Sequence, residues 1–284
     1  MSTARLVTRG IRAELGEAPH WSVAENALYW VDMMGQCAYR LTLPDEGLRR
    51  YALPQSIAWL VEREGPGFLA GMAQGVARLD LDPLRIELIG HPEPDISDHR
   101  LNDAKVDARG RLWLGTMQID AARASGALYR LDPDLSWHRM DGGYRVTNGP
   151  AFSPDGTWLY HADSLERVIY RFAVHSDGSL GVRESFVRFE VGEGMPDGMT
   201  VDAEGGLWVA HWDGARVTRF SPDGRALRCV EMPVSRPTSV AFAGIGLDRL
   251  FVTSAACELD EPLAGELFEI EPGVRGLAPQ RFRA

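Results

Sequence analysis

The sequence predicts an all-β fold: a six-bladed β-propeller with four antiparallel strands in each blade, forming a single domain over residues 1–284. Two repeated patterns support this prediction. An apolar strand signature recurs six times, at intervals of 40, 44, 47, 48 and 43 residues, and a second strand signature follows each copy. A period of about 40–50 residues with several short β-rich runs is typical of propellers, whose blades bury their faces against one another.

The repeated elements can be placed one by one along the chain. The first signature occupies Leu28–Val31, Phe68–Gly71, Leu112–Gly115, Leu159–Ala162, Leu207–Ala210 and Leu250–Thr253. The second occupies Tyr39–Leu41, Ala77–Leu79, Tyr129–Leu131, Tyr170–Phe172, Thr218–Phe220 and Phe268–Ile270. Hairpin turns are predicted at Asp107–Gly110, Pro154–Gly156, Asp202–Gly205 and Pro222–Gly224. No segment has a convincing helical period, and six copies in phase disfavour a β-sandwich.

Closure of the ring involves the two ends of the chain. A propeller must close its ring or leave an exposed sheet edge. The sixth repeat ends near Ile270. We therefore expect Arg275–Ala284 to add a strand beside Arg5–Arg12 and to complete the last blade.

The composition excludes several classes of partner. The net charge is −10 with no basic block, which argues against nucleic acid and anionic membrane surfaces. No apolar run approaches the roughly 18 residues of a membrane span, and the first residues contain no signal-peptide core. Three widely spaced cysteines, Cys37, Cys229 and Cys257, fit free thiols in a reducing compartment. We therefore expect a cytoplasmic protein.

The repeat register also locates a candidate site. The strand before each first signature begins with one polar residue: Glu17, Ser56, Asn102, Asn148, Asp197 and Thr238. Four residues later each copy is apolar: Trp21, Leu60, Val106, Phe152, Val201 and Phe242. The innermost strands of a propeller run in the same direction. We therefore expect the six polar residues to meet as a ring at one mouth of the central channel.

The chemistry of this ring predicts a divalent cation. Two of its members are carboxylates and two are carboxamides, and oxygen ligands of this kind suit a hard divalent ion. Without a cation, two neighbouring acids would repel each other and one would tend to stay protonated. The site is indicated by the shared register, because Glu17 alone would be an ordinary surface acid.

Two ring members also allow a simpler interpretation as turn residues. Asp197 lies in Pro196–Gly198, and Asn148 precedes Gly149, and both sequences are compatible with β-turns. The hairpin turns of these two blades are, however, already supplied by Asp202–Gly205 and Pro154–Gly156. The ring interpretation is therefore favoured over the turn interpretation.

Five motifs resemble a known family. They are Leu15–Trp21 (LGEAPHW), Arg100–Asp107 (RLNDAKVD), Gly115–Met117 (GTM), Thr147–Pro150 (TNGP) and Pro196–Gly198 (PDG). In this order they resemble the senescence marker protein/gluconolactonase family, which includes regucalcin and bacterial sugar lactonases. The resemblance extends over about residues 14–270. It implies a six-bladed propeller with one divalent metal in the channel mouth.

The resemblance also assigns roles to particular residues. It implies that Glu17, Asn148 and Asp197 are the metal ligands, and that Asn102 lies near the metal, directly or through water. Arg100 and Asn102 would hold hydroxyl groups of a sugar lactone. Regucalcin-like members carry a glutamate after the Gly-Thr-Met motif, where this chain has Asp120. We expect Asp120 to contact the substrate from the loop of residues 118–125.

The expected reaction is the opening of a gluconolactone or pentonolactone to the aldonic acid. The metal would polarise the lactone carbonyl and stabilise the oxyanion formed when water attacks. The resemblance implies Asp197 as the base, with metal-bound hydroxide as the alternative. The chain lacks a Gly-x-Ser-x-Gly nucleophile motif, and its cysteines form no metal-like pairs. His20, His161 and His211 are not expected to be catalytic.

Two other functions stay open at this point: a non-catalytic calcium- or ligand-binding propeller, and an arylesterase-like hydrolase. Arg100, Asn102 and Asp120 favour a polyhydroxy substrate over an aryl ester. Oxygen ligands accept calcium, zinc, manganese, magnesium and iron(II), so the sequence does not select the metal. It also leaves open which sugar lactone is the substrate, and the oligomeric state.

Overall fold

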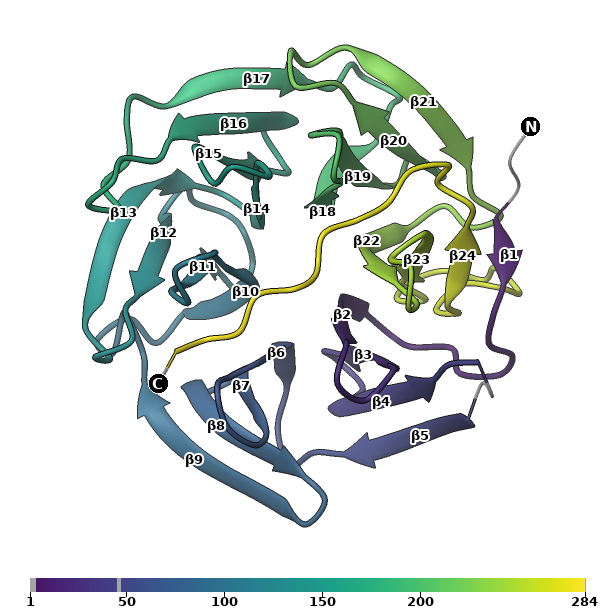
Figure 1. The fold of residues 1–284 in the computed structure, drawn as a ribbon, viewed down its shortest axis with the longest axis horizontal. Coiled ribbons are helices and arrows are strands. Elements are labelled where there is room, and N and C mark those ends of the chain that lie inside the picture. Colours follow the sequence, from purple (N-terminus) through teal and green to yellow (C-terminus); the bar gives the residue numbers. More distant parts are fainter. Residues whose placement is uncertain (1–3, 45–46, 284) are drawn as a thin grey trace.

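The computed structural model describes residues 4–44 and 47–283, and all its strands lie in six four-stranded antiparallel sheets. The sheets are arranged as blades around a common axis (Figure 1). No helix occurs in the described residues, and so none is long and apolar enough to cross a membrane. The predicted six-bladed β-propeller is therefore confirmed.

The first three blades use consecutive strands. The first blade contains β2 (Gly16–Ser22), β3 (Ala27–Asp32), β4 (Cys37–Thr42) and β5 (Gly47–Ala52). The second contains β6 (Ile57–Glu62), β7 (Phe68–Met72), β8 (Gly75–Leu81) and β9 (Leu84–Gly90). The third contains β10 (His99–Val106), β11 (Leu112–Gln118), β12 (Gly126–Leu131) and β13 (Trp137–Tyr144).

The last three blades follow the same order, except that the sixth takes its outer strand from the N-terminus. The fourth blade contains β14 (Thr147–Phe152), β15 (Trp158–Asp163), β16 (Val168–Ala173) and β17 (Glu184–Arg188). The fifth contains β18 (Met195–Val201), β19 (Leu207–Trp212), β20 (Arg216–Phe220) and β21 (Ala226–Glu231). The sixth contains β22 (Pro237–Ala243), β23 (Arg249–Ser254), β24 (Phe268–Ile270) and β1 (Arg5–Leu6).

The innermost strands β2, β6, β10, β14, β18 and β22 contact their neighbours around the axis. They all begin at one face of the ring, here named the start face, and end at the opposite end face. Each contains a one-residue β-bulge soon after it begins, between Glu17/His20, Ile57/Trp59, Leu101/Ala104, Asn148/Ala151, Pro196/Met199 and Pro237/Val240. Bulges interrupt a ladder and redirect side chains, so this repeated feature shapes the start face.

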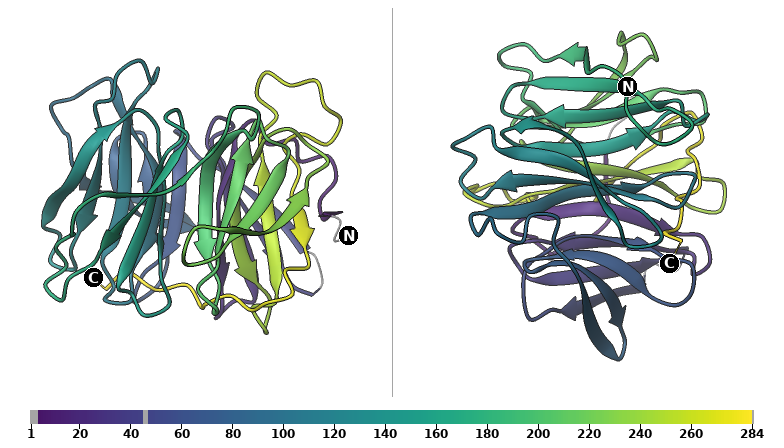
Figure 2. Two further views of the ribbon diagram at one scale, coloured as in Figure 1. Left: turned by 90° about the horizontal axis from the view of Figure 1, so that it is seen from above. Right: turned by 90° about the vertical axis from the view of Figure 1, so that its left-hand side faces the viewer.

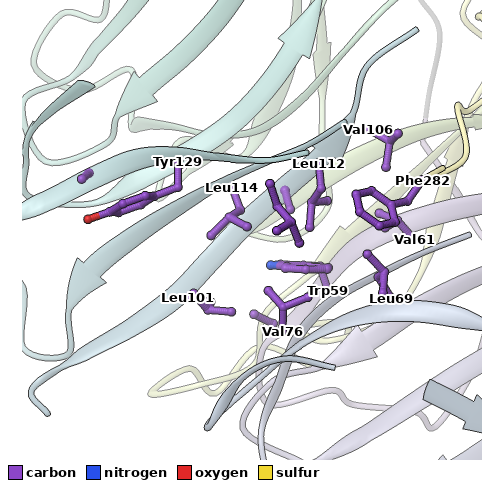
Figure 3. Close-up of a cluster of buried hydrophobic side chains, with 14 of the residues drawn as sticks. Trp59, Val61, Leu69, Val76, Leu101, Val106, Leu112, Leu114, Tyr129 and Phe282 are labelled. Carbon is purple, nitrogen blue, oxygen red and sulfur yellow. The ribbon is translucent and has the colours of Figure 1, made fainter. Parts of the chain in front are cut away.

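The blades pack on one another through buried apolar side chains. Figure 3 shows one cluster, in which Trp59 and Leu69 of the second blade lie with Leu112 and Leu114 of the third. The same cluster contains Phe282, from the C-terminal segment. Burying a large apolar side chain contributes about 1.5–3 kcal/mol, so these interfaces supply much of the stability of the ring.

The N-terminus closes the sixth blade. β1 pairs antiparallel with β24, with Arg5 opposite Glu269 and Leu6 opposite Phe268. The expectation that Arg275–Ala284 would form the closing strand beside Arg5–Arg12 is therefore wrong. The outer edge of β24 is already covered by β1, so it offers no free ladder to the C-terminal residues. Ala284 itself lies outside the described residues.

The C-terminal segment instead crosses the end face, as Figure 1 shows in yellow. Gly276 forms a bridge with Asp202, which follows the innermost strand of the fifth blade. Phe282 forms a parallel bridge with Arg63, which follows the innermost strand of the second blade. We call residues 275–283 the strap, because they connect opposite sides of the ring (Figure 2).

Several local predictions are confirmed. The glycines of the four predicted hairpin turns, Gly110, Gly156, Gly205 and Gly224, all have positive φ angles between 69° and 85°. Each donates its amide to the carbonyl three residues earlier, as a tight turn requires. The three cysteines Cys37, Cys229 and Cys257 are free.

Candidate active site

The predicted ring of polar residues lies in the bulges at the start face. Glu17 pairs with Val31 and Asn148 pairs with Ala162, each directly before its bulge. Asn102 and Asp197 occupy the equivalent positions in β10 and β18, within their bulges. The turn interpretation of Asn148 and Asp197 is therefore wrong, because both residues lie inside strands.

The second blade contributes no polar residue to the ring. Ile57 pairs with Met72 in the same way that Leu101 pairs with Thr116, so the equivalent of Asn102 is Ala58. Ser56 lies before β6 begins, and its predicted place in the ring is wrong. Counting back from the next strand failed here because the spacing between strands varies from blade to blade, and only the ladder fixes the register.

Thr238 lies at the ring position of β22, but its hydroxyl forms hydrogen bonds within the protein. The hydroxyl donates to the carbonyl of Gly16 at 2.5 Å and shares a hydrogen bond with the Thr253 hydroxyl at 2.8 Å. The side chain is fully buried. Thr238 therefore ties the sixth blade to the residue that precedes Glu17, and its oxygen already has two partners.

An amide network joins the third, fourth and fifth blades. Asn102 Nδ2 donates to the Thr147 carbonyl at 2.6 Å and to Asn148 Oδ1 at 3.0 Å. Asn148 Nδ2 donates to Ser164 Oγ at 2.9 Å, and Ser164 Oγ donates to the Pro196 carbonyl at 2.6 Å. These bonds fix the orientation of the Asn148 amide. Its Oδ1 keeps a second lone pair, which is available to a ligand.

Glu17, Asp103 and Asp197 lie within electrostatic reach of one another at the start face. Burial and the neighbouring charge of Asp103 raise the pKa of Glu17 to about 8. Burial, with Glu17 and Asp103 as neighbouring charges, raises the pKa of Asp197 well above its ordinary value. Burial also raises the pKa of Asp103 to about 6. The site therefore concentrates acidic groups whose negative charge the neighbouring cations of the protein only partly neutralise.

Asp103 is the member of this group that sequence reasoning missed. Its Oδ2 accepts a hydrogen bond from the Gly149 amide at 3.1 Å, and its Oδ1 accepts one from its neighbour Ala104 at 2.7 Å. A bulge places two successive residues opposite one partner residue, so both Asn102 and Asp103 can approach the axis. The only signal in the sequence was an acid adjacent to a ring residue.

Arg100 contributes positive charge close to the ring acids. Its Nη1 donates to Asn102 Oδ1 at 2.6 Å and to the Leu101 carbonyl at 3.1 Å. Burial lowers the pKa of Arg100, while the charges of Glu17 and Asp197 raise it. The guanidinium therefore lies within electrostatic reach of both ring acids, where it opposes the rise in their pKa values.

Buried aspartates hold the chain segments that lead into the ring. Asp32, at the end of β3, accepts hydrogen bonds from the amides of Glu14 and Leu15 at 2.9 and 3.0 Å. Asp163, at the end of β15, accepts them from Arg145 and Val146 at 2.8 and 3.2 Å. The backbone before Glu17 and before Asn148 is therefore fixed in the same way.

Close contact between blades depends on the glycine that follows Asp197. A Cβ atom on Gly198 would lie 2.1 Å from Ser239 Oγ and 2.8 Å from Ser239 Cα. Only glycine permits this approach of β18 to β22. In the Pro-Asp-Gly sequence, the glycine therefore permits close packing between blades, and the aspartate is the ring residue Asp197.

Not all predicted residues are brought together. Asp120 lies in the exposed turn after β11, where its Oδ1 accepts a hydrogen bond from the Ala122 amide at 3.1 Å. Its expected contact with substrate stays a prediction. His161 has no hydrogen-bond partner among the described residues, and burial lowers its pKa to about 3. His211 is also buried, which lowers its pKa to about 4, and its Nδ1 bonds to the Glu193 carbonyl at 2.7 Å.

The donor set at the start face fits a divalent cation. Across residues 4–44 and 47–283, no three His, Cys, Asp or Glu side chains form a metal-binding group by themselves. A cation here would therefore also need a carboxamide oxygen, and Asn148 Oδ1 is held in place to supply one. Burial and mutual repulsion raise the pKa values of Glu17 and Asp197. A bound cation would stabilise the charged forms of both side chains.

Residues 15–256 match the SMP-30/gluconolactonase/LRE-like region family. The chain belongs to this family. The 6-deoxy-6-sulfogluconolactonase of Pseudomonas putida is 38% identical over 275 residues, which cover 94% of each chain. The L-arabinolactonase of Azospirillum brasilense is 35% identical over 281 residues, which cover 95% of this chain and 93% of that one.

A solved structure agrees with this membership of the SMP-30/gluconolactonase family. The crystal structure of regucalcin from Agrobacterium tumefaciens, described as a calcium-binding protein, superposes with a TM-score of 0.94 at 27% identity. The match covers 100% of this chain and 98% of that one. The resemblance inferred from the five motifs is therefore confirmed, and the region that matches the family contains Glu17, Asn148 and Asp197.

Proposed function

We propose that this protein is a lactonase that opens a sugar lactone to the aldonic acid with the help of one divalent cation. The observation that carries the proposal is the meeting of Glu17, Asp197 and the fixed carboxamide of Asn148 at the start face. The names of the relatives in the SMP-30/gluconolactonase family support a lactone as substrate.

Glu17, Asn148 and Asp197 would hold the cation. When bound, the cation would polarise the lactone carbonyl and stabilise negative charge on its oxygen. Two carboxylates would match the 2+ charge, and the calcium-binding relative supports a divalent ion in general. The identity of the metal is left to experiment, because oxygen ligands accept several hard or borderline ions.

Asp197 is the proposed base that takes a proton from the attacking water. Burial and the nearby acids Glu17 and Asp103 raise its pKa, which favours proton acceptance over a fully solvated aspartate. The positive charge of Arg100 opposes this rise in pKa and thereby favours the charged carboxylate. A hydrogen bond from the amide of Gly198 also favours the charged form.

Arg100 and Asn102 would orient the sugar. The Asn102 amide nitrogen donates twice within the protein. Its Oδ1 accepts one hydrogen bond from Arg100 and keeps a second lone pair for a substrate hydroxyl. The arginine has further N–H donors beyond the one that binds Asn102. Paired donors and acceptors of this kind suit a polyhydroxylated ring, which is why a sugar lactone is favoured over an aryl ester.

The deciding experiment is hydrolysis of D-glucono-1,5-lactone and L-arabino-1,4-lactone by the purified protein, followed by acid release. Activity should disappear after chelation and return when calcium, zinc, manganese, magnesium or iron(II) is added back singly. Phenyl acetate tests the arylesterase alternative under the same conditions. Metal binding with no turnover of any lactone would contradict the proposal and favour a non-catalytic calcium-binding protein.

A further inference from the structure

A cavity of about 400 Å³ lies at the end face, on the opposite side of the ring from Glu17 and Asp197. All six innermost strands contribute to its wall with residues near their ends: Trp21, Val61, Val106, Phe152, Val201 and Phe242. None of the proposed metal ligands lines it. It is therefore a separate space and not a part of the candidate active site.

The strap forms the outer side of this cavity. Residues 277–280 line it, while the strap is fixed on either side of them. Before them, the Gly276 amide donates to the Leu247 carbonyl at 2.7 Å. After them, Phe282 is fully buried and its amide donates to the Glu62 carbonyl at 3.0 Å. The middle of the strap thus spans the end face between two firm attachments, as Figure 1 shows.

The charged residues of the cavity are mainly positive, although the chain as a whole carries a net charge of −10. Lys105, Arg109 and Arg111 line it, and Asp107 is the one carboxylate among its lining residues in the described chain. Asp107 is already engaged, because its Oδ2 accepts hydrogen bonds from Arg111 and from Trp113 at 2.7 and 2.8 Å. This acid therefore does not neutralise the remaining cations.

Lys105 is the cation that lacks a close partner. It is the only lysine of the chain, and within residues 4–44 and 47–283 its ammonium makes no hydrogen bond or ion pair. Burial lowers its pKa, and the charge of Asp103, with which it forms no ion pair, opposes this. Buried ammonium groups are costly unless they are paired and hydrogen-bonded. A lysine kept in such a place, facing a cavity, suggests that an anion completes its surroundings.

We propose that this cavity binds a small organic carboxylate, with its acid group at Lys105 and its apolar body against the aromatic and aliphatic wall. The volume lies within the roughly 300–1,000 Å³ of small-molecule sites. Trp21, Phe152 and Phe242 supply apolar surface for an aliphatic chain or aromatic ring. The proposal concerns the end face alone and does not depend on the function assigned to the start face.

The test uses octanoate and benzoate as probes, with 1-octanol and benzyl alcohol as their neutral counterparts, in titration calorimetry on the full chain. Octanoate should bind with a dissociation constant of about 1 mM or below, and octanol at least about tenfold more weakly. Lys105→Met should weaken octanoate binding by about tenfold or more, because a charge-assisted hydrogen bond is lost. Absence of carboxylate binding to the unaltered chain would overturn the proposal.

A matched pair of variants tests the location even if Lys105→Met does not fold. Thr200 lines the cavity from β18, and Thr200→Glu and Thr200→Gln differ in charge but hardly in size. The Glu variant should bind octanoate at least about tenfold more weakly than the Gln variant, since it places a carboxylate beside the anion. Equal binding by the two variants would place the carboxylate elsewhere and reject the site. Asp197→Asn should bind octanoate normally, and loss of binding there would assign the probe to the start face instead.

Discussion

The two faces of the propeller are built from the two ends of the same six strands, yet they differ in chemistry. At the start face, bulges collect Glu17, Asn102, Asp103, Asn148 and Asp197, whose charges are close together and only partly balanced. At the end face, the strands finish in apolar side chains, and the strap lies across them. The start face is thus arranged for a cation, and the end face for packing around a cavity whose charged lining residues are mainly positive.

Because of this difference, we expect stability to depend mainly on the end face and activity mainly on the start face. The strap is attached by a buried aromatic ring and by backbone hydrogen bonds, which favour the folded state. The acids of the start face cost stability, because burial opposes their charged forms. Substitutions at the end face should therefore change stability more than activity, and substitutions in the ring should do the reverse.

The largest effect on stability is expected at the strap. Phe282→Ala removes a fully buried ring from the cluster that also contains Val61 and Val106 (Figure 3). Removal of a buried aromatic side chain costs about 3–5 kcal/mol, so thermal unfolding should begin at a clearly lower temperature. Lactonase activity per folded molecule should be nearly unchanged. A melting temperature equal to that of the unaltered protein would show that the strap does not hold the end face.

The largest effect on activity is expected at Asp197. Asp197→Asn keeps the shape of the side chain and an oxygen that can bind a cation, but it removes the proposed base. Its kcat should fall by about 10² or more, while its thermal stability without metal should be unchanged or higher. Saturating metal should restore occupancy without restoring the rate.

A matched control is available in the same blade. Asp223 lies exposed in the hairpin between β20 and β21, where its Oδ1 accepts a hydrogen bond from Ser221. Asp223→Asn makes the same chemical change far from the ring and should leave kcat as it is. Full recovery of Asp197→Asn by excess metal would assign Asp197 to metal binding alone and the base to another group.

A smaller effect is expected at Arg100. Arg100→Ala removes the proposed donor to the sugar hydroxyls and the partner of Asn102 Oδ1. KM for the lactone should rise by about tenfold, the scale of one hydrogen bond to a charged group. The metal content should stay the same or rise, because a positive charge near Glu17 and Asp197 is lost. A variant that loses its metal would show that Arg100 is structural.

The sequence predicted the repeats well because each blade must place similar apolar strands on similar neighbours. The same register predicted five ring positions from spacing alone: Glu17, Asn102, Asn148, Asp197 and Thr238. It misplaced Ser56 because the ladder, and not the number of residues between strands, decides which residue enters the ring. The sequence pattern cannot show how Thr238 uses its hydroxyl, since that depends on a carbonyl 222 residues away in the chain.

The errors at the chain ends have a different cause. The sequence placed both chain ends in the last blade, with Arg275–Ala284 as the added strand beside Arg5–Arg12. Which terminal segment pairs with β24 depends on competition for one strand edge, and there β1 is the segment that pairs. The strap contains little regular structure, and its position is set by a single aromatic residue, Phe282, and a few backbone hydrogen bonds. Asp103 was missed because a bulge directs two successive residues toward the axis, whereas strict strand alternation allows only one.

The smallest effect concerns how much Glu17 lowers the folding stability of the metal-free protein. Its pKa is raised from the ordinary 4.5 to about 8 in the folded state, mainly by burial and then by Asp103. Between these values the unfolded chain ionises while the folded site stays protonated, so stability should fall as the pH rises from about 4.5 to about 8.

Glu17→Gln removes this dependence. In the presence of chelator, its melting temperature should therefore exceed that of the unaltered protein by a few degrees at pH 8 and match it near pH 4.5. With saturating metal the order at pH 8 should reverse, because Glu17 is then a charged ligand that the variant lacks. Scanning calorimetry at both pH values, with and without metal, measures each comparison. If the variant gains no stability at pH 8 without metal, the carboxylate of Glu17 is already well solvated or paired, and the acids of the start face do not compete for charge as proposed.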